Sequence, residues 1–177
     1  MIELKWNKSE EGAVSQIMDK KYPEGFGIYD DTSDINRARQ YGKTTTLSAL
    51  ERFLKNDCIV IRLGFQALGN ASYSTEGIFV QAFARLILDK HEFEGLAVDS
   101  EYIESFSKIN DNDSSEAHFD DIFRIFRRWC MKEKMQIVLM IDEVDSASDN
   151  QVFLDFLAQL RFYYMERKKM IIISKKC

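Results

Sequence analysis

Residues 36–45 read Asn-Arg-Ala-Arg-Gln-Tyr-Gly-Lys-Thr-Thr, and the decapeptide closes with the triplet Gly42-Lys43-Thr44 and one further threonine. In a phosphate-binding loop the glycine lets the backbone approach a phosphate, the lysine reaches the terminal phosphates, and the threonine hydroxyl binds Mg²⁺. The full pattern has a glycine five residues before Gly42, where this chain has Arg37. The triplet alone therefore indicates half of a phosphate loop.

The segment that follows the triplet strengthens this interpretation. Its apolar residues Leu47, Leu50, Phe53 and Leu54 have helical spacing. A phosphate loop must open a helix, because the helix N-terminus supplies free N–H groups and the positive end of a dipole. The competing interpretation is a surface turn capped by a threonine.

Composition limits the class of protein. The chain has 177 residues, of which 45% are hydrophobic, and this suits one domain with a sizeable core. A net charge of −5 does not support a nucleic-acid surface over the whole molecule. No apolar run has membrane length, and the three widely spaced cysteines indicate a reducing compartment, so we expect a cytoplasmic protein without membrane contact.

Three apolar runs predict buried parallel strands near residues 58–63, 136–142 and 170–174. The second run ends in Asp142 and Glu143. Ligands of open α/β sheets bind beyond the carboxyl ends of the strands, so an aspartate there can hold Mg²⁺ near a loop threonine. The adjacent glutamate can orient or deprotonate the water that attacks a γ-phosphate.

Helical patterns lie between these strands. Ser74 or Thr75 is expected to cap a helix with an apolar stripe up to residue 87, and residues 150–168 form another. The cluster 111–115 is expected to cap a third helix, whose aromatic stripe we assign to core packing.

Residues 35–47 and 137–157 together resemble the AAA-ATPase-like domain of a family of bacterial ATPase–nuclease proteins. The resemblance covers about residues 35–168, and family members also have arginine where the usual first glycine would be. It implies an α/β fold, a three-layer P-loop NTPase of the AAA-like, additional-strand class with a parallel sheet.

The resemblance also implies a site and its cofactors, ATP and Mg²⁺. It assigns the nucleotide to Gln40, Tyr41, Gly42, Lys43, Thr44 and Thr45. Thr44 and Asp142 would hold the metal as Walker A and Walker B ligands. Glu143 and Lys43 would be the catalytic residues.

Two departures from the family bear on the domain organisation. Residues 1–29 resemble a strand–helix fragment of the family's C-terminal PD-(D/E)xK nuclease domain, with Glu3 and Lys5 as its E-x-K pair. In the family that domain follows the ATPase, whereas here the fragment precedes an ATPase-like unit at 30–177. The family also continues past the strand at 170–174, so we expect a sheet that is incomplete at the C-terminus.

These observations predict an ATP-binding protein with Mg²⁺-dependent ATPase activity. Three alternatives stay open: a nucleotide-binding interaction module without turnover, a non-functional fragment of an ATPase–nuclease protein, and a metal-dependent nuclease acting through Glu3 and Lys5. Partners beyond the nucleotide would be a second copy of the chain or another protein.

Overall fold

The computed structural model describes residues 43–142, 147, 149–165 and 170–174. The segment 1–29, the polar segment that should feed the phosphate loop, and Gln40, Tyr41, Gly42 and Glu143 lie outside the described residues. The longer elements are, in chain order, α2 (Lys43–Leu54), β1 (Cys58–Gly64), α3 (Glu76–Glu94), α4 (Ser100–Asp111), α5 (Phe119–Lys132), β2 (Gln136–Asp142), α6 (Gln151–Met165) and β3 (Met170–Ser174).

The three strands form one parallel sheet in the order β1-β2-β3. The register pairs Cys58 with Gln136 and Gly64 with Asp142, so β1 and β2 end together. The predicted strands at 136–142 and 170–174 are confirmed, and the first strand runs one residue further than expected. The chain is a mixed α/β protein, mostly helical, with a small parallel sheet.

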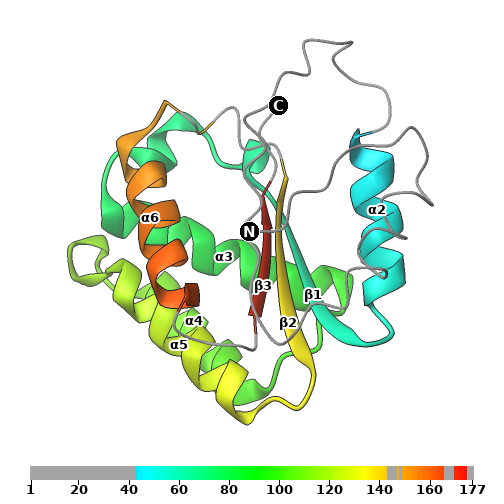
Figure 1. Cartoon of the computed structure of the whole chain (residues 1–177). Coiled ribbons are helices and arrows are strands. Elements are labelled where there is room, and N and C mark those ends of the chain that lie inside the picture. The colour runs from blue at the N-terminus through cyan, green and yellow to red at the C-terminus, as the bar shows by residue number, and fades with distance from the viewer. Residues whose placement is uncertain (1–42, 143–146, 148, 166–169, 175–177) are drawn as a thin grey trace.

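One face of this sheet carries the main hydrophobic core, to which α3, α4, α5 and α6 contribute (Figure 1). Ile61 and Leu63 of β1 point to this face with Ile137 and Leu139 of β2, because successive side chains alternate across a strand. The Phe156 ring lies 5.1 Å from that of Phe79. The aromatic stripe of α5 is buried here, as predicted.

The other face is covered by α2, which stands apart from the remaining helices in Figure 1. A small cluster of buried residues joins α2 to the strands, namely Leu50, Cys58, Val60, Val138 and Met140. Helices therefore cover both faces of the sheet.

The helix caps confirm one prediction and correct another. Thr75 is the N-cap of α3 and accepts a hydrogen bond from the Ile78 N–H at 3.3 Å. The cluster 111–115 does not cap α5: Asp113 instead accepts from the Ser115 N–H in a local turn. The N-cap of α5 is His118, whose N–H donates to the Asp121 carboxylate at 3.0 Å.

Candidate functional site

The structure places two parts of the predicted site at one edge of the sheet. Lys43, Thr44 and Thr45 are the first three described residues of α2, so the lysine and the threonine of the Gly-Lys-Thr triplet lie in a helix. Asp142 is the last residue of β2. The strands run toward this edge and α2 runs back from it (Figure 1).

A side-chain contact fixes how α2 lies against the strands. The Arg62 Nη1 donates to Ser48 Oγ at 2.9 Å and also reaches Glu51 one turn later in the helix, so this part of α2 lies beside Arg62. Lys43 lies five residues before Ser48, about 7.5 Å further along the helix at 1.5 Å per residue. Asp142 pairs with Gly64, and so lies two residues beyond Arg62 along the strands, about 6.6 Å at 3.3 Å per residue. The start of α2 therefore lies toward the end of the sheet at which β2 ends (Figure 1).

Arg62 connects the two parts of the site. Its Nη2 donates to Asp142 Oδ2 at 2.6 Å, and its Nη1 also approaches Glu51 Oε2 at 3.4 Å. Glu51 in turn pairs with the ammonium of Lys55 at 2.9 Å. The side chains of Arg62, Glu51 and Asp142 are each only 18% exposed. We call Ser48, Glu51, Arg62 and Asp142 the arginine cluster.

The arginine cluster shifts the pKa values of two members. Burial raises the pKa of Glu51, but the hydrogen bonds and charges of Lys55 and Arg62 outweigh it, so the pKa lies below its ordinary value. Burial lowers the pKa of Arg62, and the bonds and charges of Asp142 and Glu51 again outweigh it and raise the pKa. Both groups are therefore charged at neutral pH.

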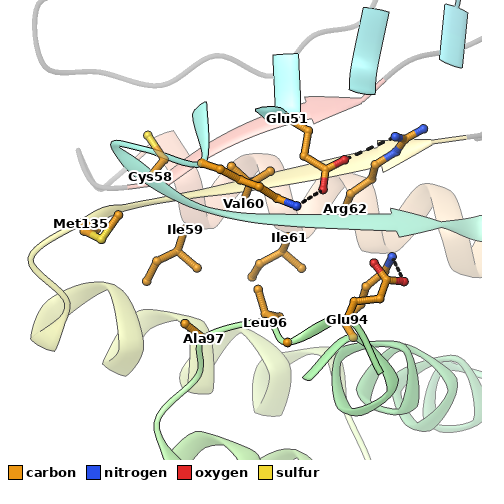
Figure 2. Close-up of a pocket in the computed structure, with 13 residues that line it drawn as sticks. Glu51, Cys58, Ile59, Val60, Ile61, Arg62, Glu94, Leu96, Ala97 and Met135 are labelled. Atoms are coloured by element: carbon orange, nitrogen blue, oxygen red, sulfur yellow. Dashed lines mark hydrogen bonds and ion pairs between the residues drawn. The ribbon is translucent and has the colours of Figure 1, made fainter. Parts of the chain in front are cut away.

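Sequence reasoning missed Ser48, Glu51 and Arg62. One signal was present: Arg62 is the lone charged residue in the apolar run 58–64. Arg62 lies two and four residues after Val60 and Cys58, so the three side chains are expected on the same face of the strand. Figure 2 shows all three on the α2 side of β1, with Ile59 and Ile61 on the opposite side. An arginine on a half-buried strand face needs a carboxylate partner, and two are within reach.

The described residues do not fit a Mg²⁺ ion at Asp142 in this arrangement. Asp142 is the one predicted metal ligand whose side chain is described, and its carboxylate is bound by the Arg62 guanidinium. Among the described residues no group of three His, Cys, Asp or Glu side chains is placed to hold a metal. The start of α2 suits a phosphate better than Asp142 suits a metal ion, because the first N–H groups of a helix have no hydrogen-bond partner within the helix.

A cavity of about 330 Å³ lies beside β1, between the second half of α2 and the turn after α3 (Figure 2). Glu51 and Arg62 are on its wall, together with Gly95 and Met135. It lies beside the middle of the strand, away from the start of α2. The cavity is therefore not the predicted phosphate site, although it shares two residues with the arginine cluster.

Comparison with protein-family models, curated proteins and solved structures gives no match for this chain. The resemblance to the ATPase–nuclease family accordingly stays a prediction. In the described part of the chain, no helix has both the length and the apolar character that crossing a membrane requires.

Proposed function

We propose that this chain binds ATP with its phosphates at the start of α2. The observation that carries the proposal is the placement of the α2 start and Asp142 at one edge of a parallel sheet. Open α/β sheets bind ligands beyond the carboxyl ends of their strands, and helix N-termini favour phosphate.

The roles follow from the chemistry of each residue. The Lys43 ammonium would neutralise the terminal phosphates, and the backbone N–H groups of 40–45 would surround them. Glu143 directly follows Asp142 and is the candidate base for an attacking water. Thr44 and Asp142 remain the candidate metal ligands for hydrolysis, for which the Arg62 guanidinium would have to leave Asp142.

Nucleotide binding without turnover is the second candidate, and the Arg62–Asp142 contact favours it. One oxygen of the Asp142 carboxylate accepts from Arg62 at 2.6 Å, and the positive charge of the guanidinium disfavours a metal ion beside it. Phosphoryl transfer relies on a metal ion to neutralise developing charge. The two candidates share the same binding site and differ in whether phosphate is released.

A titration with a fluorescent ATP analogue tests the binding step. We expect saturable binding to the full chain and at least about tenfold weaker binding to Lys43→Ala, because one phosphate contact of about 1.4 kcal/mol is lost. Lys108→Ala on α4 is the matched control and should bind like the wild type. Equal affinity of wild type and Lys43→Ala would refute the proposal.

Phosphate release under the same conditions separates the two candidates. Turnover that Glu143→Gln abolishes would support the ATPase. Binding without any release of phosphate would support the module without turnover.

A further inference from the structure

Three oxygen atoms from two elements converge on the guanidinium of Arg62. Ser48 Oγ and Glu51 Oε2 of α2 lie 2.9 Å and 3.4 Å from Nη1, and Asp142 Oδ2 of β2 lies 2.6 Å from Nη2. Two of these atoms belong to carboxylates and one to a hydroxyl. These are the ligand types that Mg²⁺ and Mn²⁺ take in proteins.

We propose that the Arg62 guanidinium occupies a cation position at this edge of the sheet and excludes divalent metal from Asp142. The proposal goes beyond nucleotide binding, because it gives the Arg62 guanidinium the role of the cation beside Asp142 at the end of β2. Its consequence for ATP, which rests on the proposed function, is binding that does not require Mg²⁺.

The charges around the cluster agree with this assignment. Glu51 and Asp142 contribute two negative charges, and Arg62 and Lys55 contribute two positive charges. Among these four side chains the charges balance without a metal ion. Removing Arg62 leaves Glu51, Asp142 and Lys55 with one net negative charge beside the volume that the guanidinium occupied, and buried charge is unfavourable unless it is paired.

An ion pair with a purely structural role would also join α2 to the sheet and stabilise the fold. The test therefore needs a measured property that does not depend on the stability of the protein. That measurement is Mn²⁺ binding to the full chain, with free Mn²⁺ followed by electron paramagnetic resonance and no nucleotide present. The variants are Arg62→Met, Arg62→Met with Asp142→Asn, and Arg85→Met as the matched control on the exposed side of α3.

We expect Arg62→Met to bind Mn²⁺ at least about tenfold more tightly than wild type, equivalent to about 1.4 kcal/mol. The added Asp142→Asn should abolish that gain, and Arg85→Met should match wild type. Equal Mn²⁺ affinity of wild type and Arg62→Met would overturn the proposal. A gain that survives Asp142→Asn would overturn it as well.

Two further variants keep the proposal testable if Arg62→Met does not fold. Arg62→Lys keeps a positive charge and should exclude Mn²⁺ as the wild type does. Asp142→Asn with Arg62 intact should leave the weak Mn²⁺ binding of the wild type unchanged. A loss of Mn²⁺ binding in Asp142→Asn alone would show that metal already reaches this carboxylate, and would refute the proposal.

The nucleotide arm repeats the fluorescent ATP titration with Mg²⁺ and with a chelator. Wild-type affinity should change less than about threefold on Mg²⁺ removal, whereas Arg62→Met should lose about tenfold. Strong Mg²⁺ dependence in both proteins would contradict the proposal. Absence of nucleotide binding would refute the proposed function alone, since the Mn²⁺ measurement decides the role of Arg62 by itself.

Discussion

The two faces of the sheet are held in different ways. The face toward α3–α6 is packed with aromatic rings, and its largest side chains are fully buried. Among the side chains that the structure describes, the face toward α2 has a cluster of five buried residues, and the arginine cluster makes a further, charged and polar contact between α2 and the sheet. Apolar packing therefore stabilises the first face, whereas charge pairing contributes to the contact at the strand ends where we propose the site.

Local stability should follow the same division. Segments with few buried apolar contacts open more readily than the core, and binding elements are drawn from such segments. We therefore expect α2 to exchange its amide hydrogens faster than α3 or α5.

The largest effect is expected on the aromatic face. Phe156 is fully buried and contacts Phe79, Phe83 and Phe123, with ring centroids 5.1 Å, 5.3 Å and 5.8 Å away. Phe156→Ala should lower the free energy of unfolding by about 3–5 kcal/mol, because it removes burial and leaves a cavity. Urea denaturation measures the change.

Phe93→Ala is the control for that prediction. Phe93 is 76% exposed at the end of α3, so its removal should change the free energy of unfolding by less than about 0.5 kcal/mol. Similar losses for Phe156→Ala and Phe93→Ala would contradict the division between the faces.

On the α2 face, Arg62→Met should cost about 2 kcal/mol of unfolding free energy, because it leaves two half-buried carboxylates without their guanidinium. Hydrogen exchange should show the loss first in α2. If the protection of amide hydrogens from exchange falls equally in α2 and α5, the arginine cluster does not stabilise α2 locally.

Glu51→Gln should have a smaller effect, about 1 kcal/mol at pH 7. The pKa of Glu51 is lowered by folding, so its contribution to stability is present above its ordinary pKa of 4.5 and is lost as the pH falls through the lower folded value. The difference between Glu51→Gln and wild type should therefore shrink in acid. A difference that stays constant from pH 7 into acid would show that charge is not its source.

The smallest effect is expected at the cap of α3. Thr75→Ala removes one exposed hydrogen bond of 3.3 Å to the Ile78 N–H, and should cost about 0.5 kcal/mol, at the low end for an N-cap. Thr75→Ser keeps the oxygen and should restore stability. Failure of serine to restore it would assign the loss to packing of the threonine methyl group.

The sequence predicted the strands well because each is a run of apolar, β-branched residues between polar segments. It did not predict the arginine cluster, because that depends on the register that pairs Gly64 with Asp142 and on the side of β1 that α2 covers. Both are tertiary facts that one sequence does not contain.

The prediction that residues 111–115 cap α5 was wrong for a local reason. Asp and Ser are the preferred N-caps, which favoured 111–115, but here they form their own turn. His118 takes the cap position because Asp121 accepts from its N–H and completes a capping box. The type of residue at a cap is thus a weaker guide than its distance from the first buried residue of the helix, Phe119.

The central claim is that ATP binds with its phosphates at the start of α2, and thermal unfolding tests it most directly. A ligand at about 100 times its Kd that binds only the folded chain adds about 2.7 kcal/mol. For a chain of this length that corresponds to about 5–10 °C in Tm. We predict that ATP raises the Tm of the wild type by such an amount and raises the Tm of Lys43→Ala, which binds ATP at least about tenfold more weakly, by no more than about half as much. An equal shift in both proteins, or no shift in the wild type, would contradict the claim.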